Sequence, residues 1–231
     1  MTDTLRDPVV ALDEFDVPES RPTRRISLRW WVALLGVVVV AAASALVAVL
    51  VVRPSSPGDD SPEAGFARDM QQHHAQAIEM SRIVRDRTDD AATRTLAYDI
   101  LTTQENQEGQ MLGWLVMWGD SQARTAPAMA WMGHDMADMG MTGATMPGMA
   151  TLAQLAKLQT LSGRAAEVFY LQLMIAHHKG GVEMAQAILG LTDRPEVVQL
   201  ANGMMTSQQS EITLMESMLA ARGATDQIPA T

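Results

Sequence analysis

Cysteine is absent from this chain of 231 residues, and aromatic side chains make up only 4% of it. Without a thiol there is no cysteine nucleophile, and a soft metal ion would have to be bound through methionine thioethers. A glycine-rich phosphate loop and a Gly-x-Ser-x-Gly nucleophile motif are also missing. We therefore predict that the protein is not an enzyme.

Positive charge is scarce outside the N-terminal segment. From residue 54 onward there are 11 lysine and arginine residues against 21 aspartate and glutamate residues. This acidic balance disfavours nucleic acid and anionic lipid as partners and tolerates cations. Methionine, in contrast, is abundant, with 18 residues, and the five histidines all lie close to methionines in the sequence.

One apolar run, Trp30 to Val52, contains 23 residues without a charge. A helix of this length crosses the roughly 30 Å hydrocarbon core of a bilayer, so residues 30–52 are predicted to be a single-pass anchor in the cell membrane. Arginines just before the run favour a cytoplasmic, disordered tail at 1–29 and an extracytoplasmic main domain. The alternative is a cleaved signal peptide, with the small residues 41–45 near the cleavage point. A polar linker is predicted at 53–62.

The sequence repeats itself with an offset of 104 residues. Met70 to Gly119 align with Met174 to Gly223 without a gap, and 14 of the 50 pairs are identical. Chance identity is about one in fifteen for ordinary composition, so the chain contains a duplicated unit.

Each unit is predicted to be a helical hairpin. Apolar residues recur at the three-four spacing of an amphipathic helix, and neither unit alternates like a strand. Asp89 and Asp193 are expected to start the second helices, and Gly119 and Gly223 to end them. Two hairpins bury their apolar stripes by packing together, so the fold class is all-α, a four-helix bundle behind one transmembrane helix. The predicted segments are a bundle at 63–223, hairpins at 63–119 and 163–223, an insert at 120–150 and a tail at 224–231.

The most specific motif is a column of histidine and methionine on the first helix of each hairpin. Thioether sulfur prefers Cu(I) and imidazole accepts either copper oxidation state, so copper is the predicted ligand, with Cu(I) favoured and Cu(II) possible. Adjacent histidines on a helix point about 100° apart, so His73 and His177 are expected to face inward, and His74 and His178 to face a neighbouring helix or solvent. The alternative is that inward histidines are hydrogen-bonded core residues and the methionines are core filler. The candidate ligands are Met70, His73, His74, Met80, Met174, His177, His178 and Met184.

The second helix of each hairpin is expected to supply polar partners for this column. If the bends centre on Thr88 and Thr192, the lengths of the two arms place His73 opposite Gln104 and His177 opposite Gln208. One turn further out, Met70 would meet Gln107 and Met174 would meet Glu211. These four polar residues are predicted to surround the metal ligands.

The insert is unusually rich in methionine. Seven of the 21 residues from Met129 to Met149 are methionine, interleaved with glycines. A flexible loop is therefore predicted, with exposed methionines outside the regular core, and it would be a labile copper-collecting site. The alternative is a mobile lid or an apolar interaction segment. The candidate ligands here are Met132, His134, Met136, Met139 and Met141.

The two histidine motifs resemble a bacterial family known as domain of unknown function 305. The resemblance rests on Phe66-Ala-Arg-Asp-Met-Gln-Gln-His73-His74-Ala-Gln-Ala-Ile-Glu79-Met80 and on the corresponding stretch from Phe169 to Ala185, and it covers residues 63 to 222. It implies a ferritin-like bundle in an exported, often membrane-attached protein, and copper binding at the four paired histidines and nearby methionines. Lys179-Gly180-Gly181 departs from the Gln-Gly-Ala expected there, and two glycines inside a helix cost roughly 1 kcal/mol each relative to alanine.

The predicted function is copper sequestration, relay or tolerance at the cell surface. Expected partners are copper ions, the membrane through the N-terminal helix, and a copper-transfer or envelope protein. One alternative is a metal-free envelope interaction or scaffold protein. A di-iron oxidase is a weaker alternative, because it needs paired Glu-x-x-His motifs and no glutamate here precedes a histidine by three residues. The sequence leaves open the copper stoichiometry, the oligomeric state and the relative direction of the two histidine helices.

Overall fold

The computed structural model describes residues 27–52, 56–133 and 146–229. It divides into two units, residues 1–54 and 55–231, which are treated separately. In the described ranges every regular element is helical, and no strand occurs. The all-α fold class is confirmed.

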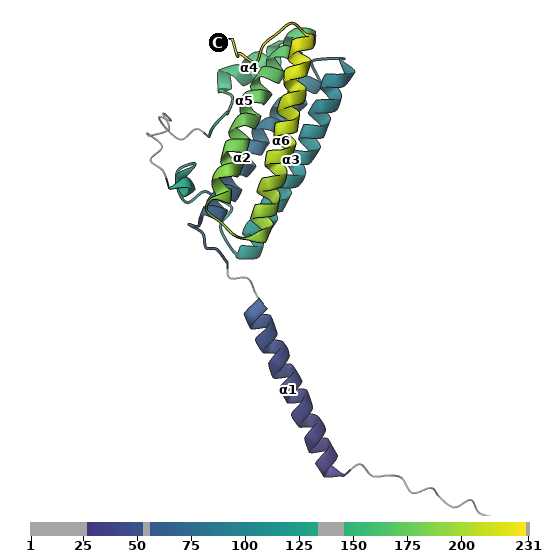
Figure 1. The fold of residues 1–231 in the computed structure, drawn as a ribbon, viewed down its shortest axis with the longest axis vertical. Coiled ribbons are helices and arrows are strands. Elements are labelled where there is room, and N and C mark those ends of the chain that lie inside the picture. The colour runs from purple at the N-terminus through teal and green to yellow at the C-terminus, as the bar shows by residue number, and fades with distance from the viewer. Residues whose placement is uncertain (1–26, 53–55, 134–145, 230–231) are drawn as a thin grey trace, which may run out of the picture. The chain divides into compact units, whose positions relative to one another are not determined.

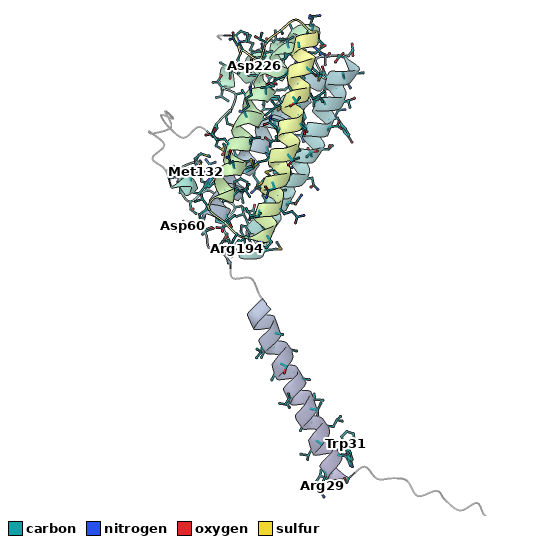
Figure 2. All side chains as sticks on the ribbon, in the orientation of Figure 1. Arg29, Trp31, Asp60, Met132, Arg194 and Asp226 are labelled. Carbon is teal, nitrogen blue, oxygen red and sulfur yellow. The ribbon has the colours of Figure 1, made fainter. Side chains whose placement is uncertain are left out.

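The first unit contains one long helix, α1 (Leu28–Val52) (Figure 1). Its 25 residues correspond to about 37 Å at 1.5 Å per residue. The helix is long and apolar enough to cross a membrane, although a signal sequence near an N-terminus has the same properties. It begins two residues before the predicted span, with Arg29 and Trp31 in its first turn (Figure 2). The predicted tail at 1–29 lies almost entirely outside the described residues.

The second unit is a bundle of four long helices. These are α2 (Pro62–Arg85), α3 (Ala91–Trp118), α5 (Gly163–Leu189) and α6 (Pro195–Ala221). Helix α2 packs against α3 and α5, and α5 packs against α6 (Figure 1). The two hairpins of the repeat are therefore α2–α3 and α5–α6, as the periodicity predicts.

The helix ends differ from the sequence prediction by one residue. The N-cap of α3 is Asp90, whose carboxylate accepts a hydrogen bond from the Thr93 amide, and not Asp89. Helix α6 follows Arg194, which makes no side-chain cap, so the predicted start at Asp193 is also one residue early. Gly119 does end α3 in the left-handed conformation, with φ of 75°, which costs glycine little because it has no Cβ atom.

The two histidine-bearing helices α2 and α5 run antiparallel. Thr88, after the end of α2, donates a 2.5 Å hydrogen bond to Glu167 in the first turns of α5. At the opposite end, Thr192 donates a 2.7 Å hydrogen bond to Glu63 in the first turn of α2. Glu63 and Glu167, like Thr88 and Thr192, are equivalent positions of the repeat. The two repeats are thus related by an approximate twofold axis, which answers the question that the sequence left open.

Between the hairpins lie two short helices that were not predicted, η1 (Ala130–Met132) and α4 (Leu152–Thr160). The buried carboxylate of Asp69 on α2 accepts hydrogen bonds from the Met129 amide at 2.6 Å and from Trp131 Nε1 at 3.0 Å. Arg124 pairs with the other oxygen of the same carboxylate at 2.7 Å. The start of the insert is therefore fixed to the bundle, and Met132 lies beside it (Figure 2).

Candidate metal centre

A layer of polar side chains, all but one of them buried, crosses the middle of the bundle. On each helix, these residues lie between the apolar residues of one hydrophobic cluster and those of a second. All four imidazoles are at most 1% exposed. We call this set the histidine layer; its members are His73 and His74 on α2, Gln104 and Gln107 on α3, His177 and His178 on α5, and Gln208 and Glu211 on α6.

The histidines pair differently from the sequence prediction. His73 and His177 face each other, with ring centroids 3.7 Å apart. His74 hydrogen-bonds to the second helix of its hairpin, with 2.8 Å between His74 Nε2 and Gln107 Oε1, whereas His73 hydrogen-bonds to Pro147. The repeat shows the same arrangement, since His178 lies 2.7 Å from Glu211. The expected pairs His73–Gln104 and His177–Gln208 are not among the hydrogen bonds of the described residues.

The reason is the rotation of α2, which touches two helices. Successive side chains on a helix point about 100° apart, so one of two adjacent histidines faces α5 and the other faces α3. His73 and His177 do point inward, as predicted, and His74 and His178 do face neighbouring helices. The error lay in assigning the inward histidines to the hairpin partner.

All four histidines use Nε2 for these hydrogen bonds. His73 Nε2 lies 3.0 Å from the Pro147 carbonyl oxygen, and His177 Nε2 lies 2.9 Å from the His73 carbonyl oxygen. A carbonyl or carboxylate oxygen only accepts, so Nε2 of His73, His177 and His178 must carry the proton. The Gln107 amide oxygen assigns the same tautomer to His74. In a neutral ring this tautomer leaves Nδ1 with an unprotonated lone pair.

These Nδ1 atoms are buried, and no described residue forms a hydrogen bond with any of the four. The side-chain oxygens of Gln104 and Gln208, in the same layer, are also buried and also lack a hydrogen-bond partner among the described residues. Buried polar atoms are rarely left without a partner, because each costs about 1–3 kcal/mol. Six such atoms lie in one layer, arranged symmetrically in the two repeats, and are available to bind a ligand.

Burial keeps the imidazoles of His73, His74 and His177 neutral. Loss of hydration lowers the pKa of His73 from 6.5 to about 4 and that of His74 to about 3. The same loss of hydration, followed by the neighbouring histidines, holds the pKa of His177 well below its usual value. Neutral imidazole is the form that binds metal ions, so at neutral pH no proton has to leave first.

The candidate methionines lie on both sides of the histidine layer. Met80 and Met174 belong to one hydrophobic cluster, and Met70 and Met184 belong to the other, all with no exposed surface. On α2, Met70 therefore lies on one side of the histidine layer and Met80 lies on the other, with His73 in the layer itself. Met70 and Met174 are one turn from their histidines, which puts them on the same helix face, whereas Met80 and Met184 are about two turns away.

The gathered donors are nitrogen and sulfur with little carboxylate. Within the described ranges, no group of three or more histidine, aspartate and glutamate side chains is placed to hold a metal ion. An ion in the histidine layer would therefore have to take methionine sulfur together with imidazole, or draw the rings together. Neutral Nδ1 atoms and thioethers fit copper, above all Cu(I), and do not fit the oxygen-preferring Mg²⁺ or Ca²⁺.

Three of the four described methionines of the insert are buried, contrary to prediction, and Met149 is partly exposed. Met129 has no exposed surface, Met132 is 8% exposed and Met146 is 5% exposed, because all three pack into the cluster around Met70. Glycine and proline correctly indicated an irregular segment, but the Asp69 contacts hold its start against α2. His134, Met136, Met139 and Met141 lie outside the described residues.

The glycine pair on α5 makes room for close contacts. A Cβ atom on Gly180 would lie 2.1 Å from the Pro147 carbonyl oxygen, and one on Gly181 would lie 2.4 Å from Gln208 Oε1. Gly180 matches the expected Gln-Gly-Ala pattern, and the departure at Gly181 is explained by the close approach of Gln208 in the histidine layer. Sequence reasoning missed Pro147 and Gln76, which hold this part of the insert. The one available signal was that position 76 of the first repeat, glutamine, becomes glycine at position 180.

The family profile described as domain of unknown function (DUF305) matches residues 63–219. The chain belongs to this family. A DUF305 protein of Streptomyces coelicolor, described as secreted, is 53% identical over 74% of this chain and 99% of its own, with a TM-score of 0.68. A DUF305 fragment from Deinococcus radiodurans is 35% identical over 73% of this chain and 99% of its own, with a TM-score of 0.58.

CopM in its Cu(II)-bound form is a third similar structure, 26% identical over 68% of this chain and 95% of its own, with a TM-score of 0.52. No curated protein matches the DUF305 chain. The likeness to the DUF305 structures extends over nearly their whole length, so the bundle described here is the family's domain.

Proposed function

We propose that this DUF305 protein is a membrane-anchored, extracytoplasmic copper-binding protein that sequesters or relays copper and has no enzymatic activity. The observation that carries the proposal is the set of four buried Nδ1 lone pairs, supplied equally by the two repeats and left without protein partners. A hydrogen-bonded core histidine would have both nitrogens satisfied. Copper-bound CopM, which shares the fold, supports the same choice of metal.

The ligands proposed for the bundle site are the Nδ1 atoms of the four histidines and the sulfurs of Met70 and Met174. Each Nε2–H bond holds its ring in the ligating tautomer, as partners beyond the direct ligands do at metal sites. Met80 and Met184 are proposed as outer donors two turns away. Residues 134–141 of the insert, with His134, Met136, Met139 and Met141, remain a proposed collecting site.

The location is proposed from the N-terminal helix. Helix α1 fits a membrane anchor, and arginines before it favour a cytoplasmic N-terminus. An oxidising exported compartment also suits thioether ligands, which form no disulfides. A copper-transfer or envelope protein would be the physiological partner, since relay requires a donor or an acceptor.

The test is a titration of the full-length chain in detergent with Cu(I) and with Cu(II). Changing Met70 and Met174 to leucine removes both sulfurs while nearly conserving volume, and Met218→Leu, in a buried position near the end of the bundle, is the matched control. We expect the double variant to weaken Cu(I) binding more than Cu(II) binding, and the control to bind like the wild type. Absence of copper binding by the wild type, together with absence of copper from protein isolated from its native membrane, would favour the metal-free scaffold instead.

A further inference from the structure

The histidine layer is covered on one side by a short segment of the insert. We call residues 146–150 the strap. The Pro147 carbonyl oxygen accepts the His73 Nε2–H bond, and Gly148 lies so close to α5 that an added Cβ atom would be 2.2 Å from the Ala176 carbonyl oxygen. The imidazoles are fully buried. An ion can therefore reach them only after some part of the protein moves.

The strap breaks the approximate twofold symmetry of the bundle. In the second repeat, His177 Nε2 donates to a helix carbonyl, that of His73, whereas His73 Nε2 donates to the strap. Gln76 on α2 holds the strap through two hydrogen bonds to Ala150, one from Nε2 at 2.9 Å and one to Oε1 at 2.7 Å. Its repeat equivalent, Gly180, provides the space for Pro147. Equivalent positions in the two repeats have thus diverged to hold the same segment.

The strap is the non-helical part of this enclosure. Four of its five residues are partly exposed, and only Met146 is buried. It is held by three hydrogen bonds that involve side chains and by the apolar contacts of Met146, Met149 and Ala150. Helices α2 and α5 are held by continuous backbone bonds and by many more buried residues. Segments with few buried apolar contacts open locally at lower cost than packed helices.

We propose that the strap is the gate through which a soft monovalent ion, Cu(I) or Ag(I), reaches and leaves the His73 side of the histidine layer. This inference rests on the proposed copper-binding function and adds its route of access. The Gln76–Ala150 bonds touch no proposed ligand, so they close the site equally with and without metal. Weakening them therefore speeds uptake and release together and leaves the dissociation constant nearly unchanged.

The experiment compares two glutamines on α2 in the full-length chain in detergent. Gln76→Ala removes both bonds to the strap, whereas Gln71→Ala removes only a bond to Ala67 of its own helix and is the control. Uptake of Cu(I) from a chromophoric chelator, and its return to excess chelator, are followed by stopped flow. For Gln76→Ala we expect both rates to rise roughly 5- to 30-fold and the dissociation constant to stay within about threefold, from the loss of two hydrogen bonds. Hydrogen exchange at the Ala150 amide should accelerate in the same variant, also without metal.

A second variant perturbs the strap from the neighbouring helix α5. Gly180→Ala places a methyl group against the Pro147 carbonyl oxygen and should accelerate both rates in the same direction. Unchanged rates in Gln76→Ala, equal changes in Gln71→Ala, or a dissociation constant that weakens as much as release accelerates would each overturn the gate. If the protein binds copper but the strap variants leave the uptake and release rates unchanged, only the gate proposal is refuted. If the wild type takes up no copper, the proposed copper-binding function is refuted as well.

Discussion

The buried histidines predict that the metal-free bundle loses stability in mild acid. A histidine whose native pKa is lowered binds fewer protons when folded than when unfolded. Stability therefore falls as the pH drops below the unfolded value of 6.5 and levels off only near the native value. For His73 this window extends from 6.5 to about 4, and for His74 from 6.5 to about 3.

The size of the effect follows from the width of the window. Each histidine contributes about 1.4 kcal/mol per pH unit well inside it, so at pH 5 each has lost about 2 kcal/mol relative to neutral pH. His73 and His74 together account for about 4 kcal/mol, and His177 acts in the same direction. This is a large part of the 5–15 kcal/mol typical of a domain.

The assay is urea unfolding of the full-length chain in detergent, followed by the helical circular dichroism signal at pH 7, 6 and 5 with a chelator present. His74→Gln removes one titrating group and retains an amide, so the slope between pH 6 and 5 should decrease by about 1.4 kcal/mol per unit. The lowered pKa of Asp90, held down by its hydrogen bonds to Thr93, acts only at lower pH. A free energy of unfolding that stays constant from pH 7 to pH 5 would refute the reasoning.

Three further outcomes follow from single contacts. Glu211→Gln should weaken copper binding by about 10- to 100-fold through loss of the carboxylate behind His178, and Gln107→Glu should strengthen it, as measured by competition with a chelator. Gly181→Ala should destabilise the fold by about 1–3 kcal/mol because its methyl group meets Gln208, whereas Gly109→Ala, which meets nothing within 4 Å, should stabilise it by about 1 kcal/mol. Denaturant melts of both glycine variants compare them directly. Asp69→Asn should release the start of the insert, seen as faster limited proteolysis there with the helical signal retained.

The architecture was predictable because it depends on local patterns in the sequence. Three-four apolar spacing gave the helices, and the 104-residue offset showed that the same hairpin occurs twice. An uncharged run of 23 residues identified the N-terminal helix. Each of these signals lies within one segment, or in the comparison of two, and needs no knowledge of how the segments are arranged in space.

The pairings within the site were not predictable in the same way. Sequence spacing places His73 and His74 on different sides of α2, but it does not say which side faces α3 and which faces α5. The antiparallel contact between α2 and α5 became evident only from Thr88–Glu167 and Thr192–Glu63.

The packing of the insert against the bundle was not predicted, for a related reason. Its composition is that of a loop, but a loop packs wherever a buried group holds it. Asp69 and Gln76 do so through single side chains far away in the sequence. No periodic pattern marks such contacts, so Met129, Met132 and Met146 were predicted to be exposed although they are buried.

The most direct test of the central claim is imidazole ¹⁵N NMR of the full-length chain, labelled at histidine and titrated with Cu(I) under anaerobic conditions. The account predicts that Nδ1 resonances of the buried histidines shift on copper binding, while their Nε2 atoms remain protonated. Shifts confined to Nε2, or no change in any of the four buried rings at saturating copper, would contradict it.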